Sequence, residues 1–431
     1  MRARLSGGAA SRATMAVTIT IGGDPMSSPR DVVVIGGGLA GAKTVEALRE
    51  QGFDGSITLI AAEPNLPYER PPLSKGFLAG GDSFEDAVTH PRDWYTEHDV
   101  DLRLSTRATA IDTEVHAVTL DEGAPLRYDK LVLATGSTPR RLTVSGAGAE
   151  RVHVLRTRQD AETLRAEFGE GRRLVVIGAG WIGLEAAATA RAKGSVVTVV
   201  APSTIPLANA LGDRMGTVYA KLHREHGVTF KLRTSVAEIT ATAGRATGVR
   251  LTNGETIRAD AVLVGIGAEP NVALAEAAGL AVDNGVLVDA GLRTSDPDIY
   301  AVGDIANVDH PVLGARSRVE HWATALNQPA IAATNLLGGE ARWEELPYFF
   351  SDQYDVGMEY YGQPGEEDSL VIRGSLDTRE FVAFWLDANR ITAVMNVNVW
   401  DVIDAVKPII AARRPVDPAR LADPEVPFAE L

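Results

Sequence analysis

One local pattern occurs twice in this chain, and it restricts the fold more than any other feature. A short, mostly β-branched segment, residues 31–35, runs directly into a glycine-rich turn at 36–41, and residues with helical spacing follow it. The same succession of strand, turn and helix begins again at residue 173, so that Gly178 lies 142 residues after Gly36. A repeat of this length is too long for a solenoid, and it predicts two similar α/β domains with parallel sheets.

Each turn has the sequence Gly-x-Gly-x-x-Gly between a predicted strand and a predicted helix, which is the context that dinucleotide binding requires. Glycines let the backbone approach a pyrophosphate, and the helix N-terminus offers free N–H groups and a positive dipole. The alternatives are a plain tight turn for the first unit and a degenerate unit without ligand for the second. The first unit consists of Gly36, Gly38 and Gly41, and the second of Gly178, Gly180 and Gly183.

The two units differ at the end of the strand that follows each helix. Glu63 lies there in the first unit, 27 residues after Gly36, where its carboxylate can accept hydrogen bonds from the ribose hydroxyls of an adenosine. Ala201 stands at this place in the second unit, which removes the acceptor that selects NAD and the charge that repels a 2′-phosphate. The residues predict a nicotinamide dinucleotide there without deciding between NADH and NADPH, and NADH is slightly favoured.

The composition excludes several kinds of chemistry. The 431 residues include no cysteine, which excludes disulfides, thiolate zinc sites, cysteine-ligated iron–sulfur clusters and redox dithiols, so redox chemistry needs a bound organic cofactor. Asp and Glu outnumber Lys and Arg by 57 to 42, and the net charge of −15 argues against binding nucleic acid or anionic membranes. No apolar run reaches the ~18 residues of a membrane helix. We expect a soluble, cytoplasmic protein.

Two further segments are predicted to carry no site. His223 and His226 share one face of a predicted helix, but their neighbours are charged and contain no carboxylate cluster, so we expect a solvent-exposed face and no metal. Residues 1–29 lack the apolar core and cleavage site of a secretory signal. We expect a loose N-terminal extension there, with Met26 as an alternative to Met1 as the start.

A third element points to a family. Residues 294–304, Thr-Ser-Asp-Pro-Asp-Ile-Tyr-Ala-Val-Gly-Asp, place Gly303 and Asp304 just past a short strand, where Asp304 can accept hydrogen bonds from a ribityl chain. Together with the first glycine unit and Ala-Thr-Gly at 134–136, this segment resembles the FAD-binding pattern of flavoprotein reductases with two dinucleotide-binding domains.

Three more segments narrow the resemblance. They are Pro-Tyr-Glu-Arg-Pro-Pro-Leu-Ser-Lys at 67–75, Arg-Val-Glu-His-Trp-Ala-Thr-Ala at 318–325 and Ser-Asp-Gln-Tyr-Asp at 351–355. They resemble the single-flavin ferredoxin and rubredoxin reductases that supply electrons to oxygenases, and the resemblance covers about residues 31–415. One position departs from the family pattern: aromatic residues at 348–350 precede Ser-Asp-Gln where the family has tryptophan, so no electron-bridging tryptophan is expected there.

The resemblance implies an α/β fold with two Rossmann-like dinucleotide-binding domains, for FAD and NAD(P)H, followed by a C-terminal α+β domain. The FAD-binding domain is expected to be discontinuous, because the segment ending at Asp304 follows the second glycine unit in sequence but belongs with the first cofactor. The expected boundaries are 1–29 for the extension, 30–145 and 267–339 for the FAD-binding domain, 146–266 for the NAD(P)H-binding domain and 340–431 for the C-terminal domain.

The resemblance also implies roles for single residues. Lys75 is expected beside flavin N5 and paired with Glu185, where both act electrostatically and by orientation. The segment from Arg318 is expected to open a helix that points its N-terminus at flavin N1 and O2. Trp322 is expected either to cover the ring or to be an ordinary core aromatic. Further implied FAD contacts are Arg70, Ala134, Thr135, Gly136, Gly303, Glu320 and His321, and those of NAD(P)H are Ile182, Glu185, Ala201 and Gly267.

The implied activity is hydride transfer from NAD(P)H to FAD, followed by single-electron transfer to a [2Fe–2S] ferredoxin or a rubredoxin. That carrier would supply a P450 monooxygenase or a ring-hydroxylating dioxygenase. Two alternatives stay open: an NAD(P)H oxidase or quinone reductase of the same fold, and a flavoprotein resembling apoptosis-inducing factor, in which NAD(P)H binding itself is the function. The oligomeric state is open between monomer and homodimer.

Overall fold

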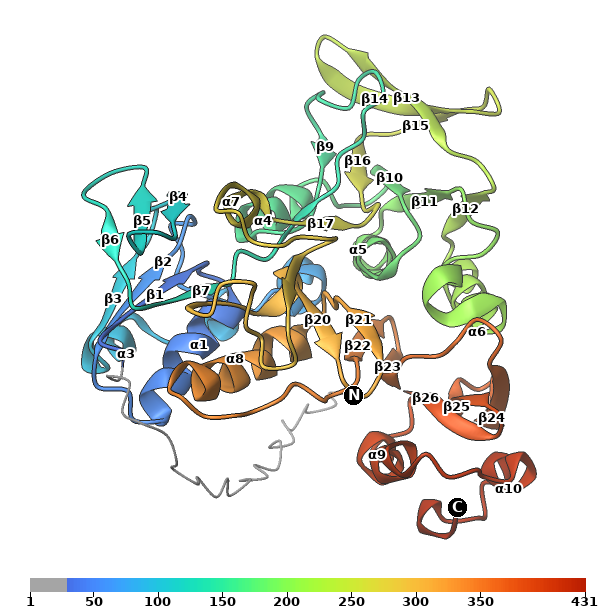
Figure 1. Cartoon of the computed structure of the whole chain (residues 1–431). Helices are drawn as coiled ribbons and strands as arrows, with labels where there is room; N and C mark the ends of the chain where they lie inside the picture. The colour runs from blue at the N-terminus through green and yellow to red at the C-terminus, as the bar shows by residue number, and fades with distance from the viewer. Residues whose placement is uncertain (1–28) are drawn as a thin grey trace.

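The computed structural model describes residues 29–431, so the expected N-terminal extension and the choice between Met1 and Met26 lie outside the described residues. The first domain is built on a five-stranded parallel sheet (Figure 1). Its central strand is almost fully buried, as a strand covered on both faces must be. The strands in spatial order are β19 (Ile299–Ala301), β7 (Lys130–Leu133), β1 (Asp31–Ile35), β2 (Ser56–Ile60) and β3 (Val100–Arg103).

The second domain repeats this sheet with the same order of equivalent strands. Each glycine turn follows the central strand, which is β1 in the first sheet and β10 in the second. The internal repeat predicted from the sequence is therefore confirmed. The second sheet consists of β9 (Val152–His153), β16 (Ala261–Val264), β10 (Arg173–Ile177), β11 (Val196–Ala201) and β12 (Thr229–Leu232).

A small antiparallel sheet is attached to each parallel sheet, and its last hairpin leads into the strand that ends in glycine, as predicted. The two small sheets are β4 (Ala108–Asp112), β5 (Ala117–Leu120) and β6 (Leu126–Arg127), and β13 (Val236–Thr242), β14 (Arg245–Leu251) and β15 (Thr256–Arg258). The remaining strands of this part are β8 (Ser137–Pro139), β17 (Ala268–Pro270), β18 (Val286–Val288), β20 (Ala306–His310) and β21 (Ala315–Ser317).

Two helices cover one face of the first sheet side by side, α1 (Leu39–Glu50) and α8 (Trp322–Leu336) (Figure 1). The helix expected from Arg318 begins four residues later, because His321 has extended backbone angles, φ −112° and ψ 151°. The Arg318 side chain is bonded to the Asp304 carbonyl and to Glu320, which holds the preceding segment out of the helix. The other helices before the C-terminal domain are η1 (Pro71–Ser74), α2 (Gly76–Ala79), η2 (Glu85–Ala87), α3 (Arg92–Glu97), α4 (Arg158–Arg165), α5 (Trp181–Ala192), α6 (Ala208–Glu225), α7 (Ala273–Ala277) and η3 (Gly303–Ile305).

The C-terminal domain is an antiparallel sheet with helices on one face. Its strands alternate between two cores, since Val382 packs with the helices while Phe381 joins Leu184 and Tyr219 of the second domain in one buried cluster. Figure 1 shows α6 directly above this sheet. The elements are β22 (Tyr348–Gln353), β23 (Val356–Gly362), β26 (Arg390–Val397), β25 (Glu380–Asp387) and β24 (Ser369–Ser375), with α9 (Val402–Ala412), α10 (Pro418–Ala422) and η4 (Phe428–Glu430).

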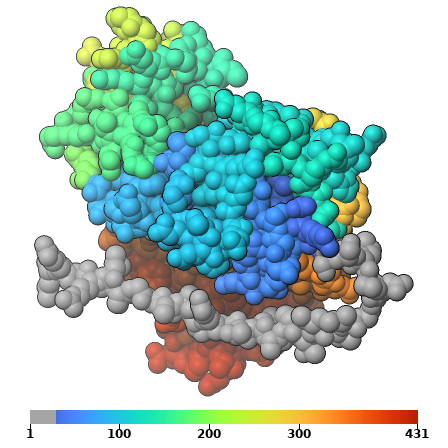
Figure 2. Space-filling model, turned by 90° about the vertical axis from the view of Figure 1, so that its left-hand side faces the viewer, coloured from blue at the N-terminus to red at the C-terminus, as the bar shows by residue number. Residues whose placement is uncertain are grey.

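The predicted fold class, two parallel α/β domains and an α+β domain, agrees with this architecture. β19 lies beside β7 in the first sheet although it follows the whole second domain in sequence. The exact domain boundaries stay a prediction. Seen from the side, the second domain lies above the first and the C-terminal domain below it (Figure 2). Within residues 29–431, no helix combines the length and the apolar character needed to cross a membrane.

Candidate active site

A cavity of about 1430 Å³ lies where the two glycine turns, β22 and the start of α8 meet. Pockets for one small ligand measure roughly 300–1,000 Å³, so this cavity has room for more than one such ligand. Among the predicted site residues, Gly41, Gly178, Gly183, Ala201 and Gly303 lie outside the lining. The predicted residues that line it are Gly36, Gly38, Glu63, Arg70, Lys75, Ala134, Thr135, Gly136, Gly180, Ile182, Glu185, Gly267, Asp304, Glu320, His321 and Trp322.

The glycines of the first unit do two different things. A Cβ on Gly36 would lie 2.1 Å from the Ala134 carbonyl oxygen, and one on Gly41 would lie 1.9 Å from the Gly36 oxygen. These two glycines therefore allow strand and helix to pack closely. Gly38 precedes α1 without any side-chain cap, and no atom lies within 4 Å of where its Cβ would be. The start of α1 is thus open to the cavity, as a helix that binds a pyrophosphate must be.

The glycines of the second unit also divide into two that allow close packing and one that leaves the helix start open. A Cβ on Gly178 would lie 2.1 Å from the Gly265 oxygen and one on Gly183 would lie 2.6 Å from the Gly178 oxygen, whereas Gly180 has open space. Ile182, in the first turn of α5, lines the cavity with 48% of its surface exposed. The contact of Ile182 with NAD(P)H stays a prediction.

Two carboxylates stand at the ends of strands beside the first turn. Glu63 accepts hydrogen bonds from the Tyr68 hydroxyl at 2.7 Å and from Arg70 at 3.1 Å. A carboxylate has about four acceptor positions, so Glu63 retains capacity for ribose hydroxyls. Asp304 Oδ2 accepts from Ser137 Oγ at 2.7 Å and from Arg156 Nη2 at 2.9 Å.

Arg156 is a cavity residue that the sequence did not reveal. It follows the short edge strand β9, where no motif marks it, and only its place after a strand end could have suggested a site. Within the part of the chain that the structure describes, Arg156 Nε and His321 Nδ1 are buried without a hydrogen-bond partner, and both residues line the cavity. Burial lowers the pKa of His321 to about 4, so this ring is neutral near pH 7. Two such atoms fit a ligand rich in hydrogen-bonding groups, as FAD is.

Lys75 and Glu185 form an ion pair in the cavity wall. Lys75 Nζ lies 2.9 Å from Glu185 Oε2, and the two side chains are 17% and 5% exposed. Ser74 donates to the same carboxylate oxygen at 2.5 Å, and Ser351 donates to Oε1 at 2.6 Å. Neither serine was assigned a role from the sequence. Both oxygens of the Glu185 carboxylate are thus hydrogen-bonded, which is what a buried charge needs. The catalytic role of the pair stays a prediction.

Trp322 lies on the wall between the large cavity and a smaller one of about 310 Å³. Its indole nitrogen donates to Glu69 at 2.9 Å, and its ring centre is 6.0 Å from that of Phe350 in an edge-on arrangement. Phe350 in turn lies 5.3 Å from Lys75 Nζ. Trp322 is half-buried, so its position fits a cavity wall better than an apolar core.

Ala201 does not occupy the position equivalent to Glu63, contrary to the expectation from the sequence. Gly36 N donates to the Ile60 oxygen and Gly178 N donates to the Val200 oxygen, so Ala201 corresponds to residue 61 and Glu63 corresponds to Ser203. Ala201 is 3% exposed and packs in the core. Sequence spacing missed this offset because β11 continues one residue beyond the equivalent end of β2. The second unit has no carboxylate at the corrected position either.

The expectation of a solvent-exposed face at His223 is wrong. His223 is fully buried, with Nε2 2.8 Å from Gln353 Oε1 and Nδ1 3.3 Å from the Tyr354 hydroxyl. The C-terminal domain covers His223, which the local sequence does not show, whereas His226 is exposed as expected. No cluster of three metal-ligating side chains occurs among residues 29–431.

The buried His223 makes stability depend on pH. Burial lowers its pKa from 6.5 to about 4, so below pH 6.5 the unfolded chain takes up a proton that the folded chain does not. The stability that the neutral, buried His223 contributes is fully present above pH 6.5 and is lost as the pH falls toward 4. We expect the free energy of unfolding of the wild type to fall about 1.4 kcal/mol per pH unit more steeply than that of His223→Gln in this window. Urea titrations across the window check this, and parallel curves would contradict it.

The sequence comparisons show the family of the chain. Residues 30–328 match the family described as pyridine nucleotide-disulphide oxidoreductase, and residues 348–431 match the reductase C-terminal domain. The chain belongs to the pyridine nucleotide-disulphide oxidoreductase family. This oxidoreductase has no cysteine, so it carries the two dinucleotide units of the family without a redox dithiol. The resemblance to flavoprotein reductases drawn from the sequence is confirmed.

Close relatives extend over nearly the whole oxidoreductase. The anthranilate 1,2-dioxygenase system ferredoxin–NAD(+) reductase component of Burkholderia cepacia is 44% identical over 395 residues, which are 91% of this chain and 97% of the relative. Rhodocoxin reductase of Rhodococcus erythropolis is 40% identical over 392 residues, 91% and 92% of the two chains. The crystal structure of the covalent putidaredoxin reductase–putidaredoxin complex matches with a TM-score of 0.91 at 38% identity, covering 94% of this chain and 98% of the other.

Proposed function

We propose that this chain is an FAD-dependent NAD(P)H:ferredoxin oxidoreductase whose electron acceptor is a [2Fe–2S] ferredoxin or a rubredoxin of an oxygenase system. One observation carries the proposal: a single cavity joins both glycine turns to the Lys75–Glu185 pair. Relatives named as ferredoxin–NAD(+) reductase components of dioxygenase systems support the acceptor. The enzyme acts in the cytoplasm as a monomer or homodimer.

The residues of the chain position and tune the reactants. FAD, when bound, supplies hydride acceptance and single-electron release. The open start of α1 at Gly38 holds its pyrophosphate, Glu63 its adenosine ribose, and Asp304 its ribityl hydroxyls. The open start of α5 at Gly180 holds the pyrophosphate of NAD(P)H. Lys75 then lies at the junction of the two binding sites, where its charge is fixed by Glu185.

The test is anaerobic stopped-flow absorbance of the FAD-loaded protein mixed with NADH and, separately, with NADPH, followed by a [2Fe–2S] ferredoxin. Fast bleaching by one coenzyme and reoxidation by the ferredoxin are expected. Reoxidation by oxygen or a quinone at the same rate without any carrier protein would favour an oxidase or quinone reductase. Slow bleaching without electron delivery to any carrier would overturn the proposal.

The assignment of the second glycine turn to NAD(P)H gives a separate prediction. Gly180→Ala places a Cβ in open space at the start of α5, so the fold tolerates it while the pyrophosphate does not. We expect at least a tenfold rise in KM for NADH, equivalent to about 1.4 kcal/mol of binding, with the FAD content unchanged. Steady-state kinetics and flavin absorbance measure both quantities. Loss of FAD with unchanged KM would reverse the assignment of the two turns.

A further inference from the structure

Glu185 is the end of a hydrogen-bond chain that the proposed reaction does not use. Ser351 Oγ lies 2.6 Å from Glu185 Oε1, and Gln353 Nε2 donates to Ser351 Oγ at 3.1 Å. Gln353 Oε1 lies 2.8 Å from His223 Nε2, and the Tyr354 hydroxyl lies 3.3 Å from His223 Nδ1. Four hydrogen bonds thus connect Tyr354, in the turn after β22, with Glu185 in the cavity wall.

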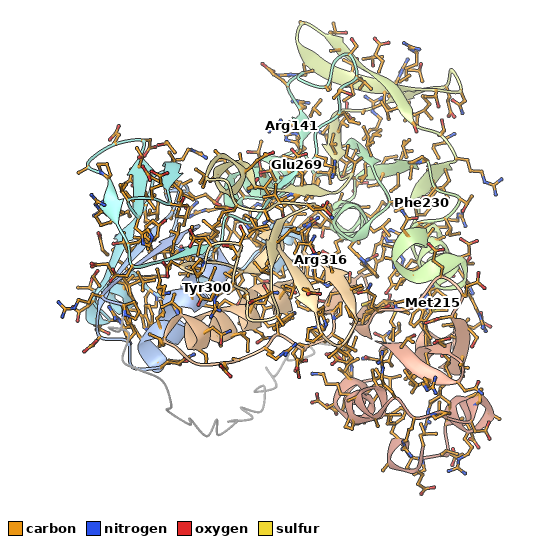
Figure 3. All side chains as sticks on the ribbon, viewed as in Figure 1. Arg141, Met215, Phe230, Glu269, Tyr300 and Arg316 are labelled. Atoms are coloured by element: carbon orange, nitrogen blue, oxygen red, sulfur yellow. The ribbon has the colours of Figure 1, made fainter. Side chains whose placement is uncertain are left out.

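This chain crosses from one domain to another. Glu185 belongs to α5 and His223 to α6, both in the second domain, while Ser351 and Gln353 belong to β22 of the C-terminal domain. His223 packs edge-on against Phe230, with ring centres 6.1 Å apart. Figure 3 labels Phe230 and also Met215, which lies on α6 beside the C-terminal domain. The polar chain therefore runs through the apolar contact between these two domains.

The hydrogen bonds have one consistent direction. Ionised Glu185 only accepts, so the Ser351 hydroxyl must donate to it, and Ser351 Oγ is then free to accept from the Gln353 amide. The Gln353 carbonyl must accept from His223, which places the imidazole proton on Nε2 and leaves Nδ1 to accept from Tyr354. Every donor in the chain points toward the carboxylate. Aligned hydrogen bonds in a low-dielectric interior strengthen one another.

Burial makes this arrangement rigid. Ser351 and Gln353 are each 1% exposed, and His223 is fully buried. The two oxygens of Glu185 are consequently fixed from different sides. Ser74, which ends η1, and Lys75 of the first domain hold Oε2, and Ser351 of the C-terminal domain holds Oε1. The carboxylate cannot rotate without breaking hydrogen bonds to one domain or the other.

We propose that Ser351, held by Gln353 and His223, is a positioning residue that fixes Glu185 and through it Lys75 for hydride transfer. The C-terminal domain thereby completes the nicotinamide–flavin junction. This inference rests on the proposed function. Without the Ser351 hydroxyl, Oε1 of Glu185 would lose its hydrogen bond to the C-terminal domain. The carboxylate could then rotate, and the Lys75 ammonium would move with it.

The kinetic test compares three serine variants of the FAD-loaded enzyme. Ser351→Ala is expected to slow NADH-driven flavin bleaching about tenfold, the effect of one hydrogen bond to a charged group, with the KM for NADH within about twofold. Ser351→Thr keeps the hydroxyl and is expected to stay within about twofold of the wild-type rate. Ser195→Ala is the matched control, because Ser195 is fully buried and its hydroxyl bonds only to Gly169. Its rate is expected to be unchanged.

A second measurement does not depend on activity. Hydrogen–nitrogen NMR spectra of holoenzyme with isotope-labelled histidine report which ring nitrogen of His223 is protonated, and His223→Gln identifies its signal by loss. Protonation at Nε2 is expected. Protonation at Nδ1 would reverse the chain, leave Ser351 unable to donate to Glu185, and overturn the proposal. So would wild-type bleaching in Ser351→Ala, or equal losses in Ser351→Ala and Ser351→Thr. A wild-type protein that neither coenzyme reduces would refute the proposed function instead. The histidine spectrum would still show whether the hydrogen-bond chain has the proposed direction.

Discussion

Lys75→Met is expected to lower the free energy of unfolding of the holoenzyme by about 3 kcal/mol, the lower end of the cost of leaving a buried charge without its partner. Glu185 is only 5% exposed, so the variant strands a carboxylate away from water. The hydroxyls of Ser74 and Ser351 still donate to it, which keeps the loss at that lower end. The rate of flavin reduction by NADH is expected to fall as well, and its redox potential to change.

The double variant Lys75→Met/Glu185→Leu distinguishes the ion pair from simple packing. Replacing both charges by apolar groups of similar size removes the stranded charge, and we expect it to recover at least half of the lost stability. Lys231→Met is the control, because the side chains of its ion pair with Glu255 are 34% and 41% exposed and the pair is worth less than about 1 kcal/mol. Urea unfolding measures all three. Equal losses of stability in Lys75→Met and Lys231→Met would contradict the role of Lys75 as the partner of a buried charge. An unchanged rate of flavin reduction and an unchanged flavin potential in Lys75→Met would contradict its predicted catalytic role.

Gly41→Ala and Gly38→Ala are expected to fail in different ways. A Cβ on Gly41 would lie 1.9 Å from a backbone oxygen, so α1 must shift away from β1, and we expect a loss of about 3 kcal/mol of stability. A Cβ on Gly38 meets no atom within 4 Å, so the fold should lose less than about 1 kcal/mol. That same methyl group enters the cavity at the open helix start, and at least a tenfold weaker affinity for FAD is expected.

Urea unfolding and FAD titration by fluorescence quenching measure the two quantities for both variants. Gly148→Ala is a control for the change from glycine to alanine alone, because its Cβ also meets no atom within 4 Å, its φ is not positive, and Gly148 lies outside the cavity lining. Wild-type FAD affinity in Gly38→Ala would show that the first turn does not approach a cofactor. Wild-type stability in Gly41→Ala would show that close packing of α1 is not needed.

The sequence predicts the local structure that is set by residues close to one another along the chain. The strand at 31–35, its glycine turn and their repeat at 173–183 appear in the structure as expected, because strand, turn and helix follow one another directly along the chain. The strand just before Asp304, β19, lies in the first sheet, as the resemblance implied. Lys75 and Glu185 are 110 positions apart, and only the family resemblance, with no periodicity, predicted their pairing.

The predictions that were wrong, and the site residues that were missed, depend on contacts between distant parts of the chain. His223 looked exposed because its own helix carries charged neighbours, and nothing local reveals that the C-terminal sheet covers that face. Arg156 and Ser351 were missed for the same reason, since each becomes a site residue only when another domain brings a carboxylate to it. The start of α8 was misplaced because the Arg318 side chain bonds to the Asp304 carbonyl, which lies on a separate turn.

The buried cluster that joins the second domain to the C-terminal sheet has a consequence for how the molecule comes apart. Phe381 and Met358 share that cluster with Leu184 and Tyr219, while the first sheet has a separate core. Regions that share one core open together in native-state fluctuations. The second domain and the face of the C-terminal sheet that packs on it are therefore expected to open together. A chain truncated before β22 would leave an apolar face of the second domain in water and expose it to self-association.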